Sequence, residues 1–308
     1  MRYQKLVFDS ARWDGFEFRS GDIVISTPPK CGTTWTQMLC ALLIFDGPDF
    51  PAPLEKMSPW LDMLNRPIED VRATYAAQEY RRFIKTHTPL DGLPLHEDVT
   101  YVVVGRDPRD VSISMEHHTA NVDFDRFMAL RATVVESDGA AELSRRLDEP
   151  DDPVERFRQF VDVDDLAGRA TLSSVLHHLD TAWQRRAAPN IALFHYADYQ
   201  ADLPGEMLRL ANALEIELSP VRAVELAPEA GLARMRERAD DVVPSASMGT
   251  WKSTVSFLRA GATGEWRERA TDADLLAYDE RVAELVAPDL AAWAHRGRIA
   301  TGIDPGTA

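Results

Sequence analysis

The sequence predicts a single α/β domain whose mainly parallel central sheet is flanked by helices. Four short apolar runs, at 22–26, 81–86, 100–105 and 190–196, have the length of buried strands. Stretches with helical spacing of apolar residues separate them, and this alternation favours a parallel sheet with ligands at the carboxyl ends of its strands. The 308 residues contain no internal repeat and no low-complexity linker. One domain over 1–308, with a core at about 20–290, is therefore the simpler prediction.

The first strand, at 22–26, leads into a loop with the outline of a phosphate-binding loop. The stretch "STPPKCGTTW" precedes a helix predicted from about Thr33 to Phe45. Strand, loop and helix in this order aim backbone N–H groups at an anion. A Walker A loop carries its lysine directly after the second glycine, whereas Lys30 stands two residues before Gly32. The loop thus predicts a P-loop-like nucleotide-binding core, but the displaced lysine argues against an ATPase.

Further helices are predicted over 107–118, 171–186 and 203–216, each beside one of the remaining strands. The segment at about 121–168 is acidic, proline-interrupted and weakly periodic. We expect it to be a variable helical excursion or a lid over the site, and solvated surface is an equally good interpretation.

Charge and cysteine content exclude several classes of protein. The formal net charge of -16 argues against a general nucleic-acid binder, which needs a broad basic surface. Two cysteines do not make a disulfide framework and fit a reducing compartment. The N-terminus carries charges where a signal peptide is apolar, and no apolar run reaches the roughly 20 residues of a membrane span. We expect a cytoplasmic protein without a transmembrane segment, which is compatible with peripheral membrane contact.

Four motifs resemble those of the cytosolic-type sulfotransferases, which use 3'-phosphoadenosine 5'-phosphosulfate (PAPS). In chain order they are "TPPKCGTTW", "FIKTHTP", "VVVGRDPRDVSIS" and "RAGATGEW", and they span most of the sequence. Between these motifs the sequence, for example "SPWLD" and "FHYADYQADL", looks most like the sequences of actinobacterial members that act on glycolipids. The resemblance implies transfer of the sulfuryl group of PAPS to a hydroxyl of a small molecule or glycolipid, without a metal. The products would be a sulfate ester and adenosine 3',5'-bisphosphate.

The resemblance also implies the catalytic residues. His87 would be the general base, because an imidazole with a pKa near 6.5 can take a proton from a hydroxyl at neutral pH. Lys30 would bond the bridging oxygen and Lys85 a non-bridging sulfuryl oxygen. His117 and His118 are interpreted as structural or acceptor-facing.

The donor site implied by the resemblance has a phosphate clamp and an adenine site. Arg106 and Ser114 would hold the 3'-phosphate, and Arg259 and Gly261 would close over it from the C-terminal loop. The other expected donor contacts are Lys30, Cys31, Gly32, Thr33, Thr34, Trp35 and Tyr196, of which Trp35 and Tyr196 would contact the purine.

Some positions depart from the family pattern. Ala260 stands where a lysine is expected and Leu232 where a phenylalanine is common, so donor binding should be weaker. Asp272 replaces the valine of a dimer signature, which leaves the oligomeric state open. Arg109 and Asp110 are interpreted as an exposed local pair.

Two other functions and the acceptor site stay open. A nucleotide-dependent kinase is disfavoured because no clear magnesium-binding aspartate ends a strand, and a non-catalytic nucleotide-binding protein is the second alternative. Six apolar side chains are candidates for an acceptor pocket, although core packing explains them equally well. They are Phe45, Phe50, Trp60, Leu61, Phe124 and Phe127.

Overall fold

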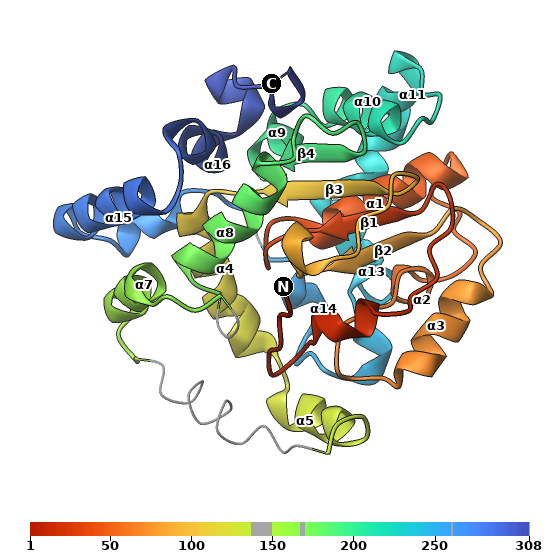
Figure 1. The fold of residues 1–308 in the computed structure, drawn as a ribbon, viewed down its shortest axis with the longest axis horizontal. Helices are drawn as coiled ribbons and strands as arrows, with labels where there is room; N and C mark the ends of the chain where they lie inside the picture. Colours follow the sequence, from red (N-terminus) through yellow and green to blue (C-terminus); the bar gives the residue numbers. More distant parts are fainter. Residues whose placement is uncertain (137–149, 167–169, 260, 308) are drawn as a thin grey trace.

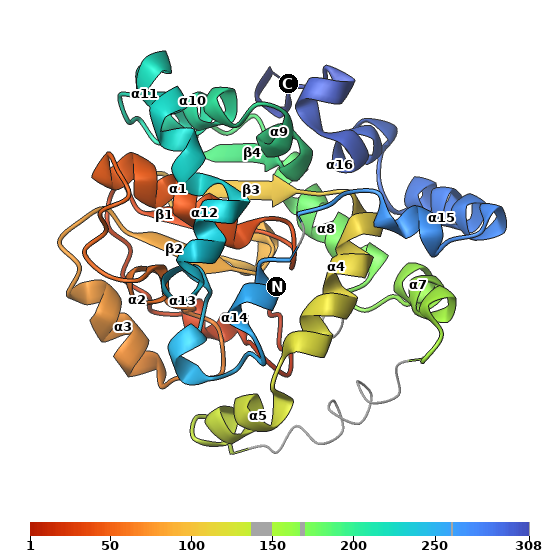
Figure 2. The same ribbon diagram turned by 180° about the vertical axis from the view of Figure 1, so that it is seen from behind.

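The computed structural model describes residues 1–136, 150–166, 170–259 and 261–307. Four strands form one parallel sheet in the order β2-β1-β3-β4. They are β1 (Ile23–Ser26), β2 (Phe83–Thr86), β3 (Thr100–Gly105) and β4 (Ile191–His195). Figure 1 and Figure 2 show the sheet at the centre of the molecule with helices on both sides, as the sequence predicts.

The helices in chain order alternate with these strands and then follow the last one. Up to β4 they are α1 (Thr33–Phe45), α2 (Leu54–Met57), α3 (Ile68–Ala76), α4 (Pro108–Asn121), α5 (Phe124–Ala132), α7 (Pro153–Asp162) and α8 (Leu172–Trp183). After β4 come α9 (Tyr196–Ala201), α10 (Leu203–Ala213), α11 (Pro220–Leu226), α12 (Leu232–Glu237), α13 (Ala239–Val242), α14 (Thr254–Phe257), α15 (Asp272–Leu285) and α16 (Pro288–Thr301).

The sheet separates two apolar cores, because successive side chains of a strand point to opposite faces. In β3, Tyr101 and Val103 join the core formed with α8, α15 and α16. Val102 and Val104 join the core formed with α1 and α10 on the other face. All four side chains are fully buried, so β3 is apolar on both faces, as a strand of a covered parallel sheet often is.

The predicted boundaries hold closely, with one instructive difference at β2. The helix expected from Thr33 to Phe45 has those limits, whereas the strand expected from residue 81 begins at Phe83. Arg82 instead forms a buried ion pair with Asp22, and Arg81 donates to the Gly21 carbonyl. These contacts hold the chain entering β1 beside the chain entering β2.

The four strand ends bring the predicted motifs to one edge of the sheet. The loop after β1 carries Lys30, His87 follows β2, Arg106 follows β3 and Tyr196 follows β4. Because the strands are parallel, their carboxyl ends meet at the same edge. The fold thereby gathers residues that are up to 166 positions apart, as counted from Lys30 to Tyr196.

The variable segment at 121–168 contains α5 and α7 in its described parts. Its stretches 137–149 and 167–168, on which the expectation of a lid also rests, lie outside the described residues. Within the described part of the chain, no helix combines the length and apolar character that a bilayer crossing needs.

Candidate active site

A cavity of about 420 Å³ lies at the carboxyl edge of the sheet. Residues after all four strands line it, together with parts of α4, α5, α12 and α14 and the N-terminal segment. Of the residues predicted for the site, those on its wall are Lys30, Gly32, Thr33, Thr34, Trp35, His87, Arg106, Ser114, Tyr196, Arg259 and Gly261. The structure thus brings most of the predicted site into one space.

The start of α1 forms one corner of the cavity. Gly32 precedes the helix with φ 104°, and in the part of the chain that the structure describes no side chain caps the helix N-terminus. The Thr33 hydroxyl lies 2.6 Å from the Thr27 hydroxyl, which orients it at the base of the loop. Since the first N–H groups of a helix have no intrahelical acceptor, this uncapped end suits a phosphate.

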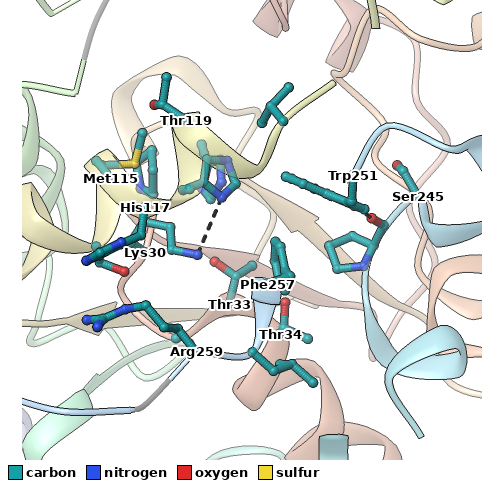
Figure 3. A pocket seen from close by; sticks show the side chains of 18 of the residues that line it. Lys30, Thr33, Thr34, Met115, His117, Thr119, Ser245, Trp251, Phe257 and Arg259 are labelled. Atoms are coloured by element: carbon teal, nitrogen blue, oxygen red, sulfur yellow. Dashed lines mark hydrogen bonds between the residues drawn. The ribbon is translucent and has the colours of Figure 1, made fainter. Parts of the chain in front are cut away.

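Lys30 reaches into the cavity from the same loop (Figure 3). Its Nζ lies 3.4 Å from Nδ1 of His118 on α4 and 4.5 Å from the centre of the Phe257 ring on α14. Burial, together with the charges of Arg106 and Arg259, lowers the pKa of Lys30 to about 8. These neighbours show that three cations converge on one end of the cavity.

The two arginines of this cluster are held differently. Arg106 donates to the carbonyls of Lys30 (3.1 Å) and Ala262 (3.0 Å), and its guanidinium stacks on the Tyr196 ring at 4.5 Å. Its Nε is buried without a partner among the described residues. Arg259 pairs through both terminal nitrogens with Glu265, at 2.9 Å for the Nη1 contact. A phosphate bound at Arg259 would therefore contact an arginine that already pairs with the carboxylate of Glu265.

Aromatic rings form the floor beside this cluster. Trp35 packs edge-on against Tyr196 and Tyr199, with ring centres 5.3 and 5.4 Å apart. The indole Nε1 of Trp35 is buried and has no partner among the described side chains. The C-terminal loop approaches here as well, since a Cβ on Gly261 would lie 3.4 Å from the Tyr196 hydroxyl oxygen.

His87 faces the cavity from the loop after β2. Its Nδ1 lies 2.8 Å from the Thr27 carbonyl oxygen, so Nδ1 carries the proton and donates it. The Trp60 ring packs on the imidazole with centres 4.7 Å apart. Burial lowers the pKa of His87 to about 3. The imidazole is therefore neutral at pH 7 and keeps the lone pair of Nε2, as a proton acceptor must.

Lys85 does not reach the cavity wall. Its side chain is 1% exposed and is not among the described residues that line the cavity. Nζ lies 5.0 Å from the centre of the Trp60 ring, and burial lowers the pKa of Lys85 to about 7. The reason is strand geometry, because Lys85 precedes His87 by two residues and so lies about 6.6 Å further back along the strand direction.

Cys31 also lies outside the cavity, although the resemblance implied a donor contact. The side chain is completely buried, and the backbone N–H donates to the Pro28 carbonyl at 3.3 Å. The thiol packs in the core below the sheet edge, where burial raises its pKa to about 12.

The interpretation of Arg109 and Asp110 as an exposed local pair is wrong. Arg109 pairs with Asp107 at 2.8 Å, and its guanidinium stacks on Trp266 at 3.9 Å from the ring centre. Asp110 is 4% exposed and accepts a hydrogen bond from the Gly264 N–H at 2.7 Å. The cause is the helix start, where Asp107 is the N-cap and Asp110, one turn on, ties the C-terminal loop to α4.

Apolar side chains make up much of the cavity wall. Trp60, Phe124 and Phe127 line it, as the sequence allowed. Leu61 is buried in the core, and Phe45 packs against Phe50 and Tyr80, so core packing accounts for these three candidates. Sequence reasoning missed several wall residues because no motif marks them: Lys5, Val7, Phe8, Met63, Met115, Thr119, Trp251 and Phe257. Leu232 does line the cavity, whereas Ala260 lies outside the described residues.

Comparison with known proteins bears directly on this site. The sulfotransferase domain family matches residues 20–288. The chain belongs to the sulfotransferase domain family. The sequence-based identification of a sulfotransferase is thus confirmed. A glycolipid sulfotransferase of Mycobacterium bovis is 48% identical over 315 residues, covering 98% of this chain and 96% of the relative. One from Mycobacterium tuberculosis is also 48% identical, over 314 residues, with the same coverage of both chains.

Solved sulfotransferase structures share the fold. A mouse sulfotransferase complexed with PAP has a TM-score of 0.70 at 16% identity, and the match covers 98% of this chain and 99% of that one. The single α/β domain with a parallel sheet, predicted from the alternation of strands and helices, is therefore confirmed by the sulfotransferase fold.

Proposed function

We propose that the protein transfers the sulfuryl group of PAPS to a hydroxyl of a small-molecule or glycolipid acceptor, and that it needs no metal to do so. The observation that carries the proposal is the layout of the cavity. Three cations and an uncapped helix start lie at one end, and a neutral histidine with an available Nε2 faces the same space. The relatives named glycolipid sulfotransferases support the acceptor class, and the mouse structure with PAP supports the nucleotide.

The cavity wall fits the proposed donor. The N–H groups at the start of α1 suit the 5'-phosphate, and Arg106 with Ser114 and Arg259 suits the 3'-phosphate. Arg106 Nε and Trp35 Nε1 are buried polar atoms without a described partner. Such atoms are costly unless a ligand or water satisfies them, which is what we expect of a bound nucleotide.

Three residues, His87, Lys30 and Lys85, have separate roles in the proposed transfer. His87 takes the acceptor proton on Nε2 as the acceptor oxygen forms its bond to sulfur, and the bond from sulfur to the phosphate oxygen breaks. Lys30 stabilises the negative charge left on that oxygen, since its ammonium has three donors and its contact with His118 uses only one of them. Lys85 would hold a sulfuryl oxygen, as the family resemblance implies, and its Nζ lies 5.0 Å from the centre of the ring of Trp60, which lines the cavity.

The proposal also includes a role for the segment at 121–168 and a cellular location. Since α5 supplies Phe124 and Phe127 to the wall, we propose that α5, in the described part of the variable segment, covers the acceptor as a lid. Both cysteines are unpaired, which supports a cytoplasmic location. Neither feature is needed for the transfer itself.

The test is a transfer assay with sulfur-labelled PAPS and a panel of phenols, steroids, sugars and lipid extracts, with the metal removed by a chelator. We expect label in at least one organic acceptor and release of adenosine 3',5'-bisphosphate in equal amount. Transfer of phosphate from ATP with magnesium to the same acceptors would instead support the kinase alternative. Tight nucleotide binding without transfer to any acceptor would support the non-catalytic one.

A further inference from the structure

A buried carboxylate contacts the strand end that carries His87. Asp62 is completely buried and is not among the described residues that line the cavity. Its Oδ2 accepts hydrogen bonds from the hydroxyls of Thr86 and of Thr88, the latter at 2.9 Å. The indole N–H of Trp13 donates to the same oxygen at 3.2 Å. Two of these three donors are therefore the residues on either side of His87 in the sequence.

The hydroxyl of Thr86 links these bonds into a chain. The Thr88 N–H donates to the Thr86 hydroxyl oxygen at 2.8 Å, and that hydroxyl in turn donates to Asp62. Hydrogen bonds in such a chain polarise one another, so each strengthens the next. The carboxylate thereby fixes the backbone on both sides of His87, and with it the point from which the imidazole leaves the chain.

The end of β1 holds the same segment. The Thr27 N–H donates to the Thr86 carbonyl at 3.2 Å, and the Ser26 hydroxyl donates to the Thr88 carbonyl at 2.7 Å. The imidazole of His87 donates from Nδ1 to the Thr27 carbonyl at 2.8 Å. This last bond depends on where the strand end lies, so a shift of the two threonines would move Nε2 as well.

The backbone at Asp62 is itself held in place by the N-terminal turn, in which Gln4 pairs with Asp9. The Asp9 N–H donates to the Asp62 carbonyl at 2.9 Å, and the Leu64 N–H donates to the Val7 carbonyl at 2.8 Å. Tertiary contacts on both sides of the carboxylate thus set its position relative to β2.

A carboxylate is an unfavourable residue for the interior of a protein. Burial raises the pKa of Asp62, and its three hydrogen bonds only partly oppose this rise. Its Oδ1 is buried and has no partner among the described residues. Apolar side chains of similar volume often stabilise a core as well as buried charges do, or better. The placement of the strand end therefore explains this carboxylate better than the stability of the core does.

We propose that Asp62 is a positioning residue for the general base: by accepting hydrogen bonds from Thr86 and Thr88, it directs Nε2 of the imidazole toward the acceptor hydroxyl. This inference rests on the proposed function, in which His87 takes the acceptor proton, and deepens it. Asp62 then contributes to kcat and hardly to binding, because a displaced base slows the transfer while the phosphate site stays intact.

The experiment compares four variants. Asp62→Leu has a similar volume and removes both acceptor oxygens, whereas Asp62→Asn keeps one. Thr88→Val removes one flanking hydroxyl and keeps the shape of the side chain. Trp13→Phe is the matched control, because it removes the third donor to the same oxygen and leaves the strand end unchanged.

The first readout is the transfer assay with sulfur-labelled PAPS. We expect Asp62→Leu to lower kcat by about a hundredfold, the size expected for a displaced catalytic group, and to leave the acceptor KM nearly unchanged. Asp62→Asn should recover most of this loss, and Thr88→Val should lower kcat by about tenfold. Trp13→Phe should be less stable in urea unfolding and keep its kcat.

The second readout does not depend on turnover. Nitrogen NMR of the histidine imidazoles reports which ring nitrogen carries the proton, and the signals of His87 are identified by their absence in His87→Ala. In the unmodified protein, Nδ1 should be protonated. Asp62→Leu should give a mixture of tautomers, whereas Asp62→Asn and Trp13→Phe should keep the proton on Nδ1.

Three results would overturn the inference: an unchanged kcat in Asp62→Leu, an equal loss in Trp13→Phe, or a loss in Asp62→Asn as large as that in Asp62→Leu. If Asp62→Leu does not fold, Thr88→Val decides by the same two readouts. If the unmodified protein transfers no sulfuryl group to any acceptor, the proposed function fails. The NMR measurement then still tests whether Asp62 positions His87.

Discussion

The proton chemistry at His87 depends on which ring nitrogen faces the cavity. The Thr27 carbonyl can only accept a hydrogen bond, so Nδ1 must carry the proton. Burial keeps the pKa of His87 at about 3, which makes the ring neutral throughout the physiological range. The hydrogen bond from Nδ1 to Thr27 thus fixes one tautomer, in which Nε2 carries a lone pair and can accept a proton.

Replacing His87 by alanine should abolish most of the sulfuryl transfer. General base catalysis contributes about 10²–10⁴-fold, so we expect a loss of that size in kcat. Binding of adenosine 3',5'-bisphosphate, measured by calorimetry, should stay nearly unchanged because the phosphate cluster is intact. His96→Ala is the control, since that exposed histidine is not a wall residue of the cavity. Near-normal turnover of His87→Ala with saturating acceptor would contradict the assignment.

Arg106→Ala should weaken nucleotide binding chiefly through the 3'-phosphate. A lost charged hydrogen bond costs about 1.5–3 kcal/mol, which is about tenfold to a hundredfold in Kd. Arg106 also donates to two backbone carbonyls, so some loss is expected for every nucleotide. The decisive comparison is calorimetry with adenosine 3',5'-bisphosphate against adenosine 5'-phosphate. Equal losses for both ligands would assign Arg106 to loop structure alone.

At the scale of elements, the loop between β1 and α1 needs unusual backbone angles. Lys30 has φ 66° and Gly32 has φ 104°, both in the left-handed region. A Cβ on Gly32 would lie 3.2 Å from Cδ2 of Tyr196. The glycine therefore serves two purposes, since it allows the turn into α1 and lets the first residue of α9 approach the loop.

Gly32→Ala should destabilise the fold and weaken nucleotide binding together. The left-handed conformation costs about 1–2 kcal/mol for a residue with a Cβ, which urea unfolding can measure. Gly302→Ala is the matched control, because Gly302 has φ 70° but a Cβ there meets nothing within 4 Å. Both variants should lose stability, but only Gly32→Ala should bind adenosine 3',5'-bisphosphate more weakly. Equal nucleotide affinities in the two variants would show that the Tyr196 contact is unimportant.

At the scale of the whole molecule, buried histidines couple stability to pH. His178 is 2% exposed and lies 2.9 Å from the Ser26 hydroxyl, and His195 is 1% exposed. Burial lowers the pKa of both imidazoles. Below about pH 6.5 the unfolded chain therefore binds protons that the folded protein does not.

The free energy of unfolding should fall as the pH drops from 7 toward 5. Stability from these groups is present above the unfolded pKa and is lost with acidification, by up to about 1.4 kcal/mol per pH unit for each histidine. Urea unfolding at pH 7, 6 and 5 measures the slope. His178→Gln should reduce it, and His96→Gln should not. An unchanged slope for His178→Gln would mean that this imidazole titrates normally.

How far the sequence predicts this protein differs between elements and side chains. The limits of α1 and β3 were predicted to the residue, because apolar runs and helical spacing are local signals. The start of β2 was missed by two residues, since the pairing of Arg82 with Asp22 is a contact across 60 positions. The exposed pair expected at Arg109 and Asp110 failed for a similar reason, as Gly264 and Trp266 lie far along the chain.

The fold class and the P-loop-like corner were predictable from the sequence, because spacing within each motif reports local geometry, and the motifs also carry the resemblance to the sulfotransferases. That resemblance also named His87, Lys30 and Arg106, which follow strands whose parallel order brings them to one edge. The tertiary structure was needed to show which apolar side chains line the cavity, that Lys85 is buried beside Trp60, and that the N-terminal turn contributes to the cavity wall. Such neighbours come from separate elements, and their contact depends on packing that no single stretch of sequence encodes.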